Sequence, residues 1–111
     1  MHWTDGHLLR IYIGEKARHG RAPLYDWIVH QAREQGIAGA TVLRGLEGFG
    51  ADSRIHTSKV LRLAIDLPII VEIVDTREKI DAFLSVIEES ITGGLATIEK
   101  VEVHWYRDGM I

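Results

Sequence analysis

The chain contains no cysteine among its 111 residues, and this absence excludes three kinds of chemistry. Disulfide bonds, thiolate metal sites and cysteine nucleophiles all require a cysteine side chain. Without cysteine the chain cannot depend on the disulfide bonds that are common in oxidising compartments. We therefore expect the protein to be cytoplasmic.

Long apolar runs and a surplus of positive charge are missing as well. No apolar stretch approaches the roughly 20 residues needed to cross a bilayer, and the amino end lacks the basic-then-apolar pattern of a secretion signal. The net charge of −3 argues against nucleic-acid binding, which usually depends on an excess of lysine and arginine facing phosphates. With 46% hydrophobic and 26% charged residues, we expect one soluble domain over residues 1–111, which is not itself embedded in a membrane.

Four stretches of the sequence have the pattern of β-strands. Leu9, Ile11 and Ile13 alternate with Arg10 and Tyr12, which predicts a strand over residues 8–14. Apolar and β-branched residues predict three more strands. The second strand begins at Gly39, the third covers residues 69–74, and the fourth begins at Ile98.

Two stretches have apolar residues at helical spacing. The first opens at Pro23 and stops at Gly36, and the second is capped by Asp75 or Thr76 and continues to Ile91. The order is therefore β-α-β, a long loop, then β-α-β. This order predicts an α+β, ferredoxin-like fold, in which a four-stranded antiparallel sheet carries two helices on one face.

The strand over residues 69–74 is apolar on both faces, although two helices can cover only one of them. Ile70 and Val74 would lie on the uncovered face. We therefore expect that face to pack against other copies of the chain. A central strand of a larger sheet would produce the same pattern.

Three segments, in this order and spacing, carry a resemblance to a known family. They are "RGLEGFGADSRIHTS" at residues 44–58, "DLPIIVEIVDT" at residues 66–76 and "GGLATIEKV" at residues 93–101. From about Leu8 to Val103 the chain resembles the PII-like signalling proteins, and more narrowly their branch catalogued as domain of unknown function 190. The resemblance implies a homotrimer whose sheets face inward and whose small-molecule sites lie in clefts between subunits.

PII-like proteins generally bind adenine nucleotides in such clefts and change the shape of the loop between the second and third strands. The loop then engages or releases an enzyme or a membrane transporter. The resemblance implies the same for the loop of this chain, from Ala51 to Leu61, with no cofactor required and no catalysis. Its basic side chains would favour an acidic partner surface or an anion: Arg54, His56 and Lys59. A solvated loop would contain the same residues.

The resemblance places Gly48, Phe49 and Gly50 at the start of this loop, beside the nucleotide cleft. Glycine lets a backbone approach a ligand closely, because it has no side chain. A bulge or turn at the end of a strand is the alternative interpretation. Arg44 adds positive charge at the same place.

Gly93 and Gly94 could form a nest of N–H groups suited to a phosphate, or only a left-handed stop at a helix end. The corresponding PII loop typically carries a lysine soon after its glycines, whereas this chain has Leu95, Ala96 and Thr97. Lys100, or a basic side chain of a neighbouring subunit, would have to supply that charge. A mono- or diphosphate would be easier to hold than a triphosphate.

Three other functions fit parts of the sequence. A metal-tolerance trimer of the CutA kind shares the topology, and scattered histidines without cysteine neither support nor exclude metal binding. His2 and His7 are expected in solvent at a flexible end. A small ferredoxin-like enzyme that hydrolyses acyl phosphates would need an asparagine to orient water, and the sequence has none. RNA binding by Tyr12, Trp105 and Tyr106 is disfavoured by the negative net charge.

Overall fold

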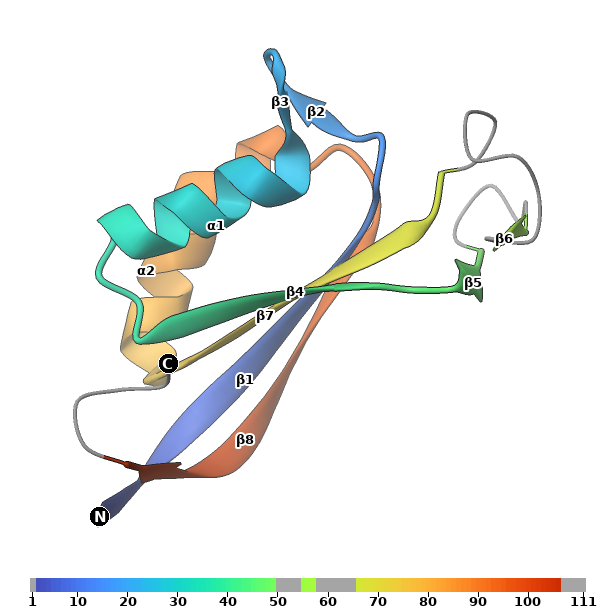
Figure 1. Cartoon of the computed structure of the whole chain (residues 1–111). Coiled ribbons are helices and arrows are strands. Elements are labelled where there is room, and N and C mark those ends of the chain that lie inside the picture. Colours follow the sequence, from blue (N-terminus) through green and yellow to red (C-terminus); the bar gives the residue numbers. More distant parts are fainter. Residues whose placement is uncertain (1, 50–54, 58–65, 107–111) are drawn as a thin grey trace.

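The computed structural model describes residues 2–49, 55–57 and 66–106, and contains one four-stranded antiparallel sheet with two helices. The strands follow the order β4-β7-β1-β8 across the sheet. Their bounds are His2–Gly14 for β1, Gly39–Arg44 for β4, Pro68–Asp75 for β7 and Leu95–Trp105 for β8. Helices α1 (Leu24–Glu34) and α2 (Arg77–Ile87) lie on the same face of the sheet (Figure 1). The predicted ferredoxin-like α+β fold is confirmed.

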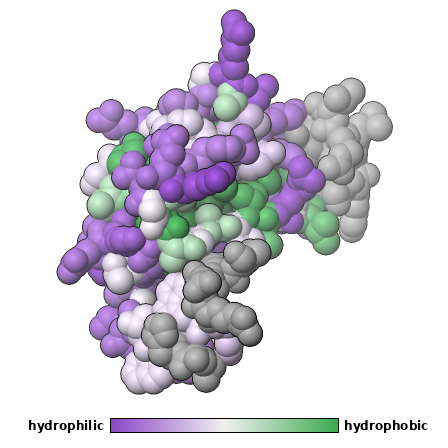
Figure 2. Space-filling view, turned by 60° about the vertical axis from the view of Figure 1, so that its left-hand side comes forward, coloured by the Kyte–Doolittle hydropathy of each residue, from purple (hydrophilic) through white to green (hydrophobic). Residues whose placement is uncertain are grey.

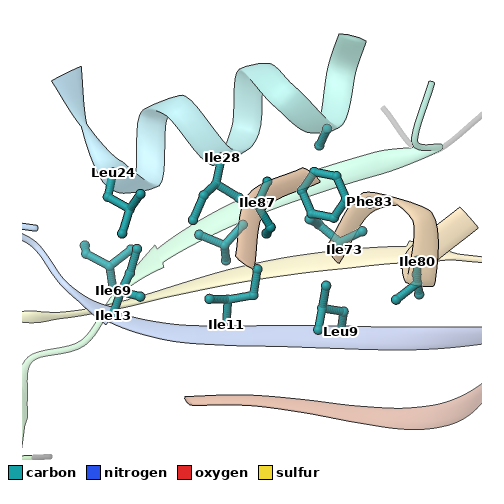
Figure 3. Packing of buried hydrophobic residues seen from close by; sticks show 12 residues of the cluster. Leu9, Ile11, Ile13, Leu24, Ile28, Ile69, Ile73, Ile80, Phe83 and Ile87 are labelled. Carbon is teal, nitrogen blue, oxygen red and sulfur yellow. The ribbon is translucent and has the colours of Figure 1, made fainter. Parts of the chain in front are cut away.

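The core lies between the sheet and the two helices. Alternate residues of β1 and β7 point toward the helices, because successive side chains of a strand face opposite sides. Figure 3 shows side chains of both helices packed against these strand residues. The buried cluster consists of Leu9, Ile11, Ile13, Leu24, Ile28, Ala32, Ile69, Val71, Ile73, Ile80, Phe83 and Ile87. The helix side of β1 and β7 is therefore covered within one chain over residues 9–13 and 69–73.

The ends of the helices follow the local chemistry of the sequence. Pro23 precedes the first residue of α1, and Gly36, with φ of +73°, lies just after its end, where a left-handed residue stops the helix. The Thr76 side chain caps α2 by accepting a hydrogen bond from the Lys79 backbone N–H at 3.3 Å.

Replacing Thr76 with alanine should lower the free energy of unfolding by about 1 kcal/mol, because the capped N–H loses its partner. Urea unfolding would measure this loss. Serine retains the hydroxyl group, so Thr76→Ser should stay within about 0.5 kcal/mol of the original chain. Equal losses in both variants would contradict the role of the cap.

Asp75 is a buried carboxylate at the junction between β7 and α2. Its Oδ2 accepts a hydrogen bond from the Ala38 backbone N–H at 2.9 Å, and its Oδ1 accepts one from the Thr76 N–H at 2.7 Å. Ala38 immediately precedes β4. The carboxylate therefore joins the entrance of β4 to the entrance of α2.

Several element boundaries differ from those expected. Strand β1 begins at His2 instead of Leu8, and β8 begins at Leu95 instead of Ile98. His7 is consequently a half-buried strand residue opposite Asp75, and the expected flexible end around it is wrong. Residues 2–7 lack an apolar alternation, so their pairing with β8 leaves no local pattern.

The expected second helix also ends earlier, at Ile87, and a 3-10 turn, η2 (Glu88–Ser90), follows it. Two short hairpins were not expected. One pairs β2 (Arg18–His19) with β3 (Ala22–Pro23), and the other pairs β5 (Glu47–Gly48) with β6 (His56–Thr57). Within the described residues, neither helix is long and apolar enough to cross a membrane.

Candidate functional site

Four strand ends meet at one end of the sheet, where the expected loop also leaves. Strands β1 and β4 finish there, and β7 and β8 begin there, because all neighbouring strands are antiparallel. In Figure 1 the chain passes from β4 to β5 at this end. We call this region the loop end and define it as residues 14–16, 44–49, 66–68 and 93–95.

Backbone hydrogen bonds hold the loop end together. The Glu15 N–H donates to the Leu67 carbonyl oxygen at 2.8 Å, and the Gly45 N–H donates to the Pro68 carbonyl oxygen at 2.7 Å. The Lys16 N–H donates to Oδ1 of Asp66 at 2.8 Å. The segments after β1 and β4 are thus both anchored to the segment that begins β7.

Close packing against Pro68 explains two of the glycines. A Cβ atom at Gly45 would lie 2.6 Å from Cγ of Pro68, and one at Gly48 would lie 3.2 Å from the same atom. Contacts below about 3.0 Å force a shift of the neighbouring atoms. The structure therefore gives Gly45 a packing role and Gly48 a tight fit at a strand end.

Gly94 and Gly93 differ in the space around them. Gly94 has φ of +112°, and a Cβ atom there would lie only 2.1 Å from the carbonyl oxygen of Tyr12. A Cβ atom at Gly93 would meet nothing within 4 Å. The fold itself accounts for Gly94, whereas no contact within the described residues accounts for Gly93.

Two of the charged groups at the loop end, Arg44 and Glu15, form an ion pair. The Arg44 guanidinium donates through Nη2 to the Glu15 carboxylate. Lys16 is joined to Asp66 through its backbone. With Glu47 included, carboxylates outnumber basic side chains among the described residues of this region. One chain therefore offers little net positive charge to an anion here.

The structure brings some of the predicted site residues together and leaves others apart. Arg44, Gly48, Phe49, Gly93 and Gly94 lie at the loop end, and Phe49 is largely exposed. The backbone of His56 pairs with that of Gly48 in the β5–β6 hairpin. Gly50, Arg54 and Lys59 lie outside the described residues, as does most of the segment from Ala51 to Leu61.

Lys100 is distant from Gly93 and Gly94, beside which it was expected to supply positive charge. It lies opposite His7 in the β1–β8 pair, about 20 Å along β8 from Gly94 at roughly 3.3 Å per residue. Lys100 also shares the helix-side face of the sheet with His7. Within one chain it does not contribute to the loop end, so its proposed role requires a second copy.

Glu15, Asp66 and Pro68 were not predicted as parts of this site. Each acts through a residue distant in the sequence, as Glu15 does with Arg44 and Pro68 with Gly45. Glu15 and Asp66 follow or precede predicted strands, and the antiparallel order places those strand ends together. That position at the strand ends is the signal that could have identified them.

The face of the sheet opposite the helices is uncovered, and we call it the open face. It carries apolar side chains that are half-buried or exposed in the chain: Leu8, Tyr12, Leu43, Ile70, Val74, Leu95, Val101, Val103 and Trp105. Leu43 is 44% exposed and Leu95 is 59% exposed. On the side of the molecule drawn in Figure 2, hydrophobic side chains reach the surface between hydrophilic areas.

An ion-paired arginine lies in the middle of the open face. Arg10 contacts Glu99 at 2.5 Å through Nη1 and Glu72 at 3.0 Å through Nε. Hydrogen bonds from Glu99 and then Glu72 raise the pKa of Arg10 above its ordinary value. Arg10 is therefore permanently charged, and this polar cluster interrupts an otherwise apolar surface.

Comparison with known proteins identifies relatives at two distances. The sequence profile of domain of unknown function 190, described as an uncharacterized ACR, matches residues 6–103. A UPF0166 protein of Aquifex aeolicus (strain VF5) is 41% identical over 99 residues, which are 86% of this chain and 90% of the relative.

Solved structures share the fold at low sequence identity. CPII from Thiomonas intermedia K12, a nitrogen regulatory PII-like protein bound to ADP, AMP and bicarbonate, superposes with a TM-score of 0.70 and 13% identity, over 92% of this chain and 91% of CPII. The B. subtilis GlnK–ATP complex gives a TM-score of 0.57 and 11% identity, over 87% of this chain and 82% of GlnK. The chain has the PII-like fold and belongs to the domain of unknown function 190 family, which includes the UPF0166 proteins.

Proposed function

We propose that this chain is a PII-like regulatory protein, which binds a small anionic ligand between its subunits and controls a partner through the loop after β5. It acts as a homotrimer in the cytoplasm and performs no catalysis. The ligand is an adenine nucleotide, and the partner is an enzyme or a membrane transporter.

The uncovered open face carries this proposal. The helices cover one side of β1 and β7 within one chain, whereas the other side of the sheet leaves Leu43, Leu95 and their apolar neighbours in contact with water. Exposed apolar patches of this kind mark association surfaces. A second copy of the same face is a matching occupant, since apolar rows on both copies would be removed from water together.

Association through the open face would also complete the ligand site. Strands β4 and β8 are the edges of the sheet, and both reach the loop end. When copies meet through their open faces, the edge of one subunit lies beside that of its neighbour, so a cleft forms next to Gly48 and Gly93. The neighbour would then provide the positive charge that one chain lacks there, with Lys100 as a candidate.

The ligand class follows from the fold relatives and from the polarity of the site. The solved structures of CPII and GlnK contain ADP, AMP or ATP. Backbone N–H groups near Gly93 could bind a phosphate without a side-chain charge. Because carboxylates are abundant at the loop end, we favour a mono- or diphosphate over a triphosphate.

Calorimetric titration of the purified protein with AMP, ADP, ATP and cyclic AMP tests the proposal. We expect saturable binding of AMP or ADP at one site per chain. Inorganic phosphate is the control, and it should bind far more weakly because it lacks the adenine and ribose contacts. No heat and no thermal stabilisation with any of the four nucleotides would contradict adenine-nucleotide binding.

A further inference from the structure

The ion pair between Arg44 and Glu15 connects the end of β4, from which the loop leaves, with the segment after β1. The proposed ligand would bind beside the same two segments. Arg44 is the last residue of β4, and Glu15 follows the last residue of β1. These strands lie on either side of β7, so the pair crosses over the beginning of β7. Two residues beyond Gly45, the chain enters the β5–β6 hairpin.

The side-chain contact is separate from the backbone frame beneath it. Backbone hydrogen bonds already fix Glu15 to Leu67 and Gly45 to Pro68. The Arg44 side chain is 47% exposed, and that of Glu15 is 26% exposed. An ion pair in contact with water is weak, so the two side chains can separate without disrupting the strands.

The Glu15 carboxylate that contacts Arg44 is chemically similar to an anionic group of a ligand. Guanidinium binds carboxylates and phosphates in the same planar, two-pronged manner. While Glu15 holds Arg44, the positive charge is neutralised, and Asp66 and Glu47 add negative charge nearby. An anion that binds Arg44 through Nη2 must replace Glu15.

We propose that Glu15 is an internal competitor for Arg44, and that the phosphate of the bound ligand displaces its carboxylate. The proposal rests on the nucleotide binding proposed above, and it assigns Glu15 as a specificity-determining residue. When the phosphate displaces Glu15, the side-chain connection between the end of β1 and the end of β4, from which the loop leaves, is lost. Ligand binding is thereby coupled to the conformation of the chain where the loop leaves β4, because Arg44 exchanges Glu15 for the phosphate.

The test compares ADP binding by the assembled protein and its Glu15→Gln variant, by calorimetry. Glutamine is similar in size but cannot neutralise Arg44, so ADP should bind about two- to fivefold more tightly. Glu47→Gln is the matched control, because it removes the same charge from the loop end and keeps the Arg44–Glu15 pair. Its affinity for ADP should change less than twofold.

A double-mutant cycle separates competition from a general effect of charge. Arg44→Gln should weaken ADP binding, and adding Glu15→Gln to it should give no recovery, because the competition has lost its target. Thermal unfolding of each variant verifies that it is folded, and Glu15→Ser, which also lacks the carboxylate, replaces Glu15→Gln if that variant does not fold.

Three results would overturn the inference, and they are distinguishable. If wild type binds ADP and Glu15→Gln binds no more tightly, competition by Glu15 is wrong while the proposed function stands. If Glu15→Gln tightens binding equally with and without Arg44, the effect is one of general charge and Arg44 is not the target. If wild type binds none of the nucleotides, the proposed function falls, and the inference falls with it.

Discussion

Replacing Leu43 with lysine should convert a trimer into separate, folded chains. Leu43 lies on the open face near the loop end and is 44% exposed in one chain. Lysine on an edge strand is well tolerated when it faces water, so the subunit should fold. In an assembled interface the ammonium groups would be buried without partners, which is strongly unfavourable. Light scattering in dilute buffer should give the mass of one chain.

Val86 provides a matched control on the other side of the molecule. It is a large aliphatic residue of α2 with a similar exposure of 42%, but it does not lie on the sheet. Val86→Lys should leave the trimer mass unchanged. Leu43→Lys should also lose ADP binding, because a separate chain lacks the neighbouring subunit that forms the other side of the proposed cleft. A wild-type protein with the mass of a single folded chain would contradict the assembly, and an unchanged mass in Leu43→Lys would exclude the open face as the interface.

The largest loss of stability at the loop end is expected for Gly94→Ala. The new methyl group would lie 2.1 Å from the Tyr12 carbonyl oxygen, and alanine at φ of +112° is strained even without that contact. The backbone must move where β8 begins beside β1. We expect the free energy of unfolding to fall by about 2–4 kcal/mol, from backbone strain and overpacking together. Denaturant unfolding measures the difference.

Gly93→Ala is the control for that substitution, because the added methyl group meets no atom within 4 Å. Its stability should change by less than about 1 kcal/mol. The same pair of variants informs the ligand site: a loss of ADP binding in the stable Gly93→Ala would support a phosphate nest at Gly93. Equal destabilisation by both substitutions would contradict the structural role assigned to Gly94.

Much of the fold was predictable because its strongest signals are local. Alternation at Leu9, Ile11 and Ile13 places one face of β1 in the core, and the cap at Thr76 marks the start of α2. Both depend only on neighbours along the chain. The first residues of β1 and the short hairpins lack such signals. The first residues of β1 pair with β8, which is distant in the sequence, and the two-residue strands of the hairpins are too short to show an alternation.

The candidate site was less predictable, because it is defined by contacts between strand ends. Gly48 and Gly94 suggested a ligand or a turn, whereas the structure adds Pro68 and the Tyr12 carbonyl as immediate steric reasons. Lys100 seemed near Gly94 because the two are close in sequence, but an extended strand separates them by about 20 Å. Glu15 matters because it pairs with Arg44. That contact depends on how the strands align in the sheet, which no local pattern of the sequence shows.

The position of Asp75 restricts which parts of the molecule can move. Its carboxylate joins the two β-α-β repeats at the far end of β7 from the loop, through the N–H groups of Ala38 and Thr76. Rotating one repeat against the other would leave a buried carboxylate without its donors, which is energetically costly. A hinge between the repeats is therefore disfavoured. We expect any rearrangement on ligand binding to occur instead at the loop end, which lies at the opposite end of β7.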